Sequence, residues 1–305
     1  TRAALLGKKI RQDIVMTGTI SQAGKVGEVG GLIEKSLAAA DAGAKYIVVP
    51  RLQVHEALLL ASVSRTKNFH AIEVQTIGDA EKAFYSDYSE KFTSKFAPES
   101  KPVPKSLEQI PLDAELGRFT LVAKKVVDDL DSKVAQAFSS GTQTEETAGL
   151  RDYFSKEIEK YYSLLSLGYP FTAANAAFLL SIDAEYVKIG DSKVDLDGSM
   201  QDVQKCVSSL SVPSKTAGNF HWATGSDLRR IWAQKKLNET VGNRADRGGY
   251  TTLRDLLFAY SWCGISRQLA AQADGIAGEK ANESALSELA AQKLAEAEET
   301  VNAAT

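Results

Sequence analysis

One lysine of this chain lies where a general base could work. Lys35 falls in the first turns of a predicted helix, shortly after the Gly30-Gly31 pair. A lysine amine accepts a proton at neutral pH only where desolvation lowers its pKa, and the apolar residues Ile33 and Leu37 could provide such a setting. Taken alone, however, a lysine near a helix start is typical of a solvated surface, so both interpretations stay open.

Short strands and one helix are predicted to position this lysine. Apolar and β-branched residues at 15–20 and 26–29 predict two short strands joined by a polar hairpin loop. The Gly30-Gly31 pair allows a sharp turn because glycine tolerates positive φ. Apolar residues then recur at three- and four-residue spacing over residues 32–43, which predicts a helix, and residues 45–50 predict a buried strand that ends in proline.

Three ordered motifs in this region match the pattern of one family. They are the runs MTGTI at residues 16–20, GKVGEVGGLIEK at residues 24–35, and AGAK at residues 42–45 followed by Pro50. In residue types and spacing they resemble the proteolytic domain of the Lon family, particularly its stand-alone archaeal members. The resemblance extends over residues 1–85. It implies an α/β module and a peptidase that works with a Ser–Lys dyad.

The resemblance also implies roles for two residues. The lysine of the family motif is the general base, which corresponds to Lys35, and the threonine beside the dyad corresponds to Thr17. A serine hydroxyl is a poor nucleophile unless an adjacent base accepts its proton, so the pairing is chemically reasonable. The family chemistry implies no cofactor. The large cytosolic members of the family carry an ATPase module, and nothing in this sequence resembles one. If the missing N-terminal part is short, cleavage is therefore expected to be independent of ATP.

The nucleophilic serine is expected to lie outside this chain. In the family it precedes the segment that corresponds to residues 5–11, and counting back from Lys35 places it before Thr1. We therefore expect a piece of a longer precursor: an expressed fragment, a proteolytic product, or half of a nicked molecule whose other half carries the serine. Thr1 itself is an alternative, because an N-terminal threonine can use its own amine as base, but its geometry would differ from the family pattern.

The composition is that of an ordinary globular protein. With 305 residues, of which 44% are hydrophobic and 25% charged, the chain is long enough for two domains. The net charge of −3 does not indicate the basic surface that is typical of nucleic-acid binding. No apolar run in the sequence is long enough to span a membrane. Two cysteines and three scattered histidines do not form a metal-binding motif.

The two cysteines leave the cellular compartment open. Cys206 and Cys263 could be two buried free thiols or one disulfide, and a disulfide would be favoured in an exported protein. Sequons at Asn238 and Asn282 are compatible with export. The stand-alone archaeal relatives often carry a leader and a membrane anchor. The resemblance thus favours an extracellular or cell-surface location with a possible anchor outside this chain, and a cytoplasmic location is the alternative.

The character of the sequence changes near residue 88. Residues 88–111 are rich in Lys, Ser and Pro and predict a linker or a surface strap. Residues 112–305 have mainly helical patterns, and within them Arg229-Arg230 is expected on a solvated helix face. The expected fold is α+β: residues 1–87 form the C-terminal portion of a Lon-like protease domain, and a predominantly helical domain follows.

Two functions are compatible with these patterns. The first is a serine endopeptidase acting on polypeptides, in which Lys35 activates the missing serine and the helical domain positions substrates or builds a homo-oligomer, since Lon-like domains commonly form rings. The second is a non-catalytic surface or scaffold protein that retains the Lon-like fold for assembly. A serine in the precursor would favour the first function, and its absence would favour the second.

Overall fold

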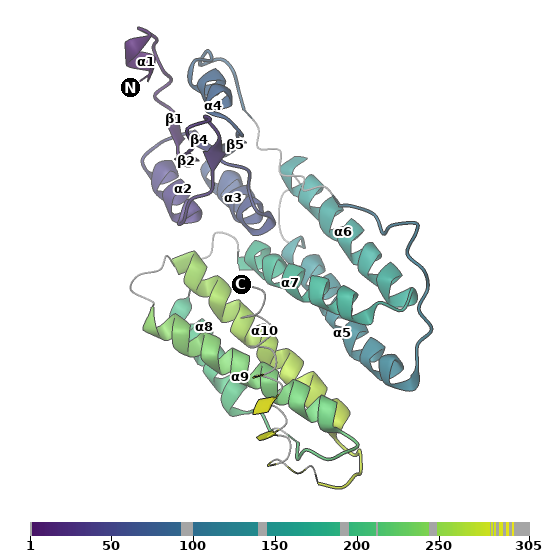
Figure 1. Ribbon diagram of the computed structural model, residues 1–305. Helices are drawn as coiled ribbons and strands as arrows, with labels where there is room; N and C mark the ends of the chain where they lie inside the picture. Colours follow the sequence, from purple (N-terminus) through teal and green to yellow (C-terminus); the bar gives the residue numbers. More distant parts are fainter. Residues whose placement is uncertain are drawn as a thin grey trace. The chain divides into compact units, whose positions relative to one another are not determined.

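The computed structural model describes most of the chain, namely residues 2–92, 100–139, 145–189, 195–211, 213–243 and 249–280, together with 282, 284, 287, 288, 291, 292 and 295. Two compact units are present: unit 1 comprises residues 1–200 and 238–258, and unit 2 comprises residues 201–237 and 259–305. Figure 1 labels their helices and strands. Helices dominate the described residues and strands β1 to β5 all belong to unit 1, so the predicted α+β class is confirmed.

A small parallel sheet organises the N-terminal part of unit 1. Its strands are β1 (Ile14–Met16), β4 (Tyr46–Val49) and β5 (His70–Glu73). β4 lies in the middle and pairs in parallel with β1 on one side and β5 on the other. Parallel neighbours need crossover connections, which are provided by the helices α2 (Leu32–Asp41) and α3 (Val54–Lys67).

The central strand β4 is buried along its whole length. All of its residues are buried, as expected for a parallel strand covered on both faces. Val48 packs in one cluster with Ile14 of β1, with Val74 after β5, and with Ala80 of the helix α4 (Ile77–Phe84). This position explains the uninterrupted apolar run that predicts a strand at 45–50.

A two-stranded hairpin interrupts the connection from β1 to α2. It consists of β2 (Thr19–Ile20) and β3 (Val26–Gly27), which pair antiparallel. The single strand predicted at 15–20 is therefore divided in two at Gly18. Gly18 has a φ of 151°, and a Cβ at this position would lie 2.7 Å from Val26 Cγ1. Only glycine fits this turn without a shift of the hairpin.

Three long helices form a bundle in the rest of unit 1, as Figure 1 shows. They are α5 (Ala114–Ala137), α6 (Glu145–Ser166) and α7 (Pro170–Ile189), which all pack against one another. Val127 and Leu130 of α5 and Phe154 of α6 are fully buried. α3 packs against α6 and α7, so the bundle and the sheet region share contacts within unit 1.

Unit 2 is fastened by one covalent bond and by paired serines. It contains most of α8 (Leu196–Ser208) and parts of α9 (Phe220–Gly242) and α10 (Gly249–Ala273). Cys206 of α8 and Cys263 of α10 form a disulfide, with Cα atoms 6.2 Å apart. The hydroxyls of Ser226 in α9 and Ser266 in α10 each donate to the other residue's carbonyl oxygen, at 2.9 and 2.8 Å. Of the two alternatives for the cysteines, the structure thus contains the disulfide.

Candidate active site

The candidate site residues lie at the edge of the sheet where the parallel strands end. Thr17 directly follows β1, and its N–H donates to the carbonyl oxygen of Val48 in β4 at 3.0 Å. α2 connects the edge where β1 ends to the opposite edge, where β4 begins. The first turn of α2, which contains Lys35, therefore lies at the same edge as Thr17. Functional groups commonly gather at this carboxyl edge of parallel sheets.

Lys35 is exposed, and its amine is held by the backbone. Its Nζ donates a hydrogen bond to the carbonyl oxygen of Gly30 at 2.8 Å. Gly31 adopts a left-handed conformation with a φ of 65°, which turns the chain into α2. Ile33 is buried and Leu37 is half-buried, yet neither encloses the exposed Lys35 side chain. The described residues therefore do not form the apolar setting expected around this amine.

Backbone hydrogen bonds fix the glycine-rich loop that leads to Lys35. The N–H of Val26 donates to the carbonyl oxygen of Gln75, and the N–H of Ile77 donates to that of Gly24, both at 2.9 Å. These bonds attach the β2–β3 hairpin to the connection between β5 and α4. The start of the loop is therefore held in place by the segment between β5 and α4.

Two carboxylates joined by one glutamine were not identified as site residues from the sequence. Gln53, at the N-cap of α3, donates through Nε2 to Glu28 Oε1 at 3.0 Å and through its N–H to Glu56 Oε2 at 2.9 Å. Burial raises the pKa of Glu56, and the Glu28 carboxylate raises it further. The three-residue spacing from Gln53 to Glu56 is a capping-box signal, whereas nothing local in the sequence indicates the position of Glu28.

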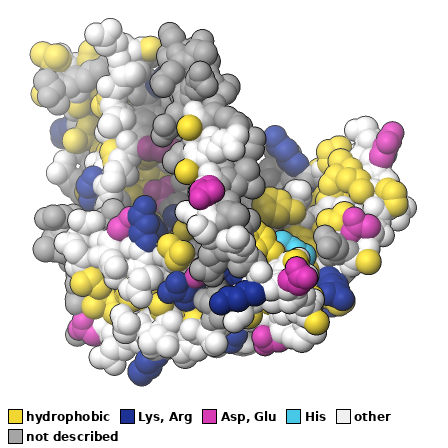
Figure 2. All heavy atoms as spheres, turned by 60° about the horizontal axis from the view of Figure 1, so that its bottom comes forward, with side chains coloured by type: hydrophobic (Ala, Val, Ile, Leu, Met, Phe, Trp, Pro, Cys, Tyr) yellow, Lys and Arg dark blue, Asp and Glu magenta, His cyan; other side chains and the backbone are white. Residues whose placement is uncertain are grey.

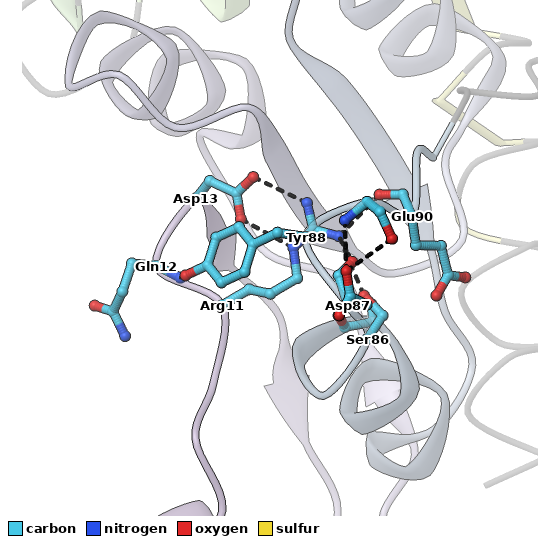
Figure 3. Close-up of polar contacts among 9 residues, drawn as sticks. Arg11, Gln12, Asp13, Ser86, Asp87, Tyr88 and Glu90 are labelled. Atoms are coloured by element: carbon cyan, nitrogen blue, oxygen red, sulfur yellow. Dashed lines mark hydrogen bonds and ion pairs between the residues drawn. The ribbon is translucent and has the colours of Figure 1, made fainter.

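A buried arginine closes the opposite edge of the sheet, where the strands begin (Figure 3). Arg11 is only 3% exposed and forms a forked ion pair with Asp13, with Nε–Oδ1 and Nη2–Oδ2 distances of 3.0 and 2.9 Å. Its Nη1 donates to the carbonyl oxygens of Asp87 and Glu90, each at 2.9 Å. The hydrogen bond to Arg11 lowers the pKa of Asp13, and the same bond raises the pKa of Arg11. Sequence reasoning missed this network.

Aromatic rings surround the same guanidinium. The Arg11 Cζ lies 5.1, 5.2 and 5.6 Å from the ring centroids of Tyr46, Tyr88 and Phe92. Tyr46 and Phe92 also meet edge to face, with centroids 5.4 Å apart. Cation–π contacts of this kind favour a positive charge at a buried position. Residues 88–92, the start of the predicted strap, therefore pack on the sheet region through Arg11.

The comparisons with known proteins point to one class for the sheet region. Residues 2–82 match the family described as the Lon protease (S16) C-terminal proteolytic domain. This segment of the chain is therefore related to the proteolytic domain of Lon proteases, and both Thr17 and Lys35 lie within it. The helical bundle α5–α7 and unit 2 lie outside the matched residues.

Several Lon proteases are similar to this segment. That of Desulforamulus reducens is 50% identical over 48 residues, which cover 16% of this chain and 6% of that protein. That of Haemophilus influenzae is 39% identical over 72 residues, 23% of this chain and 9% of that protein. The mitochondrial Lon protease homolog of Drosophila melanogaster is 29% identical over 103 residues, 34% of this chain and 9% of that protein. The chain thus spans less than a tenth of the length of these relatives, and no solved structure matches it.

Proposed function

We propose that this chain is part of an ATP-independent serine endopeptidase of the Ser–Lys dyad type that cleaves polypeptides. The observation that carries the proposal is the match of residues 2–82 to the Lon proteolytic domain, with Lys35 at the carboxyl edge of the sheet. In the proposal Lys35 is the general base. Thr17, at the same edge, helps to orient the amine.

The proposed reaction depends on a neutral lysine amine. The amine accepts the proton of a serine hydroxyl while the serine oxygen attacks the scissile carbonyl carbon, and the resulting ammonium returns the proton to the leaving amine. Burial of a lysine lowers its pKa and so favours the neutral form. Because Lys35 is exposed in this chain, we propose that the segment carrying the nucleophilic serine lies outside these 305 residues and covers the amine when it packs on the carboxyl edge.

Substitution of Lys35 tests this proposal in the complete protein. Fluorescein-labelled casein, incubated without ATP, should be cleaved, and Lys35→Ala should reduce the rate by about 10²–10⁴-fold, the usual contribution of a general base. Lys25→Ala is a matched control, because Lys25 is also exposed and lies in the same GKVGEVGGLIEK run as Lys35. Cleavage that persists in Lys35→Ala would show that Lys35 is not the base.

A non-catalytic scaffold is the second candidate. One observation favours it: the Lys35 amine is exposed and already bonded to the Gly30 carbonyl oxygen, so this chain alone does not prepare it as a base. A scaffold would assemble into a homo-oligomer without cleaving casein. Sedimentation of the complete protein, in parallel with the cleavage assay, distinguishes the two functions.

We also propose an extracellular or cell-surface location. The Cys206–Cys263 disulfide supports it, because disulfides persist mainly in oxidising compartments. Within the described residues, none of the helices combines the length and apolarity needed to cross a membrane. The proposal includes a membrane anchor outside this chain. Protease treatment of intact cells should remove the protein, whereas protection until lysis would contradict this location.

A further inference from the structure

An exposed surface of unit 2 combines aliphatic, aromatic and arginine side chains. This surface, which we name the α9 patch, consists of Leu228, Arg229, Ile231 and Trp232 of α9 and Trp262 of α10. Leu228, Ile231 and Trp232 are 38%, 47% and 38% exposed, and their spacing of three and four residues places them on one helix face. Figure 2 shows a face of the molecule on which exposed hydrophobic side chains lie beside Lys and Arg side chains.

Arg229 is a half-buried cation that forms no ion pair with the acidic side chains that the structure describes. Its guanidinium lies 5.0 Å from the ring centroid of Trp232, and burial alone lowers its pKa. The next residue, Arg230, is paired with Asp227 at 2.8 Å, whereas Arg229 has no ion-pair partner in the part of the chain that the structure describes. Arginine cannot lose its charge in a protein, so an incoming carboxylate would offset the cost of its desolvation.

The two tryptophans of the α9 patch form an angled pair. The ring centroids of Trp232 and Trp262 are 5.6 Å apart, with the planes inclined by 56°, an arrangement in which one apolar side chain can contact both rings. Trp262 is next to the buried, disulfide-bonded Cys263. The disulfide therefore ties the segment of α10 that carries this ring to α8.

We propose that the α9 patch is a docking site for a polypeptide segment that carries an apolar side chain beside a carboxylate. The apolar side chain packs on the tryptophan pair, and the carboxylate pairs with Arg229. Tryptophan and arginine are the residue types enriched at the centres of protein–protein interfaces. The apolar part of the α9 patch covers only about 6 Å along the helix axis, which suits one or two side chains and is short for the continuous apolar face of a membrane-bound helix.

Fluorescence anisotropy with two labelled peptides tests this proposal on the full chain. One is a fluorescein-labelled Gly–Ser peptide with a central Phe-Leu-Asp-Asp sequence, and the other has Asn in place of both Asp residues. The acidic peptide should bind about tenfold more tightly than the amide peptide, and Arg229→Gln should abolish this difference. Trp232→Ala should weaken binding of both by about tenfold or more, as at interface hot spots. Leu121→Ser, at a residue of α5 that is 60% exposed, is the matched control. It should change neither the affinity for the two peptides nor the preference for the acidic one.

Several results would overturn the proposal. An undiminished preference for the acidic peptide in Arg229→Gln, or an equal loss in Leu121→Ser and Trp232→Ala, would exclude the α9 patch as the site. If Trp232→Ala does not fold, as judged by circular dichroism, Arg229→Gln alone decides. Binding of phosphatidylcholine–phosphatidylglycerol vesicles without peptide binding would identify a membrane contact, and a Trp232-dependent dimer without peptide binding would identify a second copy as the partner. Peptide binding does not require cleavage, so the test is independent of the peptidase proposal.

Discussion

The Lon-like part of unit 1, which is the sheet region with the matched residues 2–82, and the helices of unit 2 are stabilised by different means. The former is built on a parallel sheet whose amino edge is closed by the buried Arg11, with its ion pair to Asp13 and its bonds to residues 86–90. The latter is fastened by the Cys206–Cys263 disulfide. One region is held only by non-covalent contacts, and the other by a covalent link that joins two helices far apart in sequence.

The candidate sites of the two regions also differ, in how complete each site is within this chain. Lys35 has the family motif but lies exposed, so its proposed chemistry needs a covering segment. The α9 patch has no family match, yet its tryptophan pair and Arg229 are already assembled within unit 2. A recognisable motif and a complete site are therefore separate properties, and four variants, one of them a double substitution, test what stabilises the two regions and the bundle between them in the sequence.

The largest effect on stability is expected at Arg11. Arg11→Ala leaves the half-buried Asp13 carboxylate unpaired and releases residues 86–90, and removal of one partner of a buried ion pair costs about 3–5 kcal/mol. Urea denaturation should show a loss of this size in the free energy of unfolding. Arg11→Lys keeps the positive charge but cannot form the two-pronged ion pair with Asp13. It should therefore retain only part of the stability that Arg11→Ala loses. Lys82→Ala, at an exposed residue, is the control, and a similar loss there would show that the effect is not specific to the network.

Removal of the disulfide should affect mainly unit 2. The double change Cys206→Ser and Cys263→Ser opens a link between residues 57 apart, which should lower the free energy of unfolding by about 2–4 kcal/mol. All three tryptophans of the chain lie in unit 2, so tryptophan fluorescence follows its unfolding. Amide hydrogen exchange in β4 should stay slow. An equal loss of protection in β4 would show that the two regions unfold together.

A pH-dependent effect is expected at Asp183 of α7. Burial raises the pKa of Asp183 from 3.8 to about 7, against the opposing charge of Arg254, while Tyr153 and Tyr161 face it from α6. The folded state therefore binds more protons than the unfolded state between pH 4 and 7. The free energy of unfolding should fall as the pH rises through this range.

The variant Asp183→Asn removes this titration. Because Asn cannot ionise, the variant should be more stable than the wild type at pH 8 by on the order of 2 kcal/mol, with little difference at pH 4. Urea denaturation at the two pH values measures the change. The same pH dependence in both proteins would show that Asp183 is not its source.

The smallest effect is expected at the start of α4. The N–H of Asp79 donates to Thr76 Oγ1 at 3.2 Å, and the Asp79 carboxylate in turn accepts from the N–H of Thr76 at 3.2 Å. Thr76→Ala removes the side-chain half of this capping box and should lower the free energy of unfolding by about 1 kcal/mol. Thr76→Ser keeps the hydroxyl and should lose much less, so equal losses would assign the effect to the methyl group.

Local signals in the sequence predict much of the Lon-like fold. The helix expected from residue 32 is α2, which begins at Leu32, and the strand expected at 45–50 is β4 at Tyr46–Val49. Both follow from hydrophobic spacing and from the glycine and proline residues around them. The role of Arg11 could not be predicted in this way. Asp13 is only two residues away, but the other hydrogen-bond partners of Arg11, in residues 86–90, lie 75 or more residues away in the sequence.

The candidate sites show the same limit. The motif around Lys35 could be recognised from its spacing, but its exposure depends on which segments cover it, and that is a property of the tertiary structure. Arg229 was expected on a solvated helix face. In the structure it is half-buried and lies against Trp232, three residues further along α9, and Trp232 in turn pairs with Trp262 of α10. The Trp232–Trp262 pair joins two different helices, and such long-range packing leaves no local signal.

The most direct test of the proposed peptidase is to locate its nucleophile. The protein would be taken from its natural source without separating associated polypeptides, treated with a serine-reactive probe, and digested for mass spectrometry. The proposed dyad predicts a labelled serine on a segment outside residues 1–305, and loss of the label in Lys35→Ala. A label on Thr1 or on a serine within the 305 residues, or a label that persists without Lys35, would contradict it.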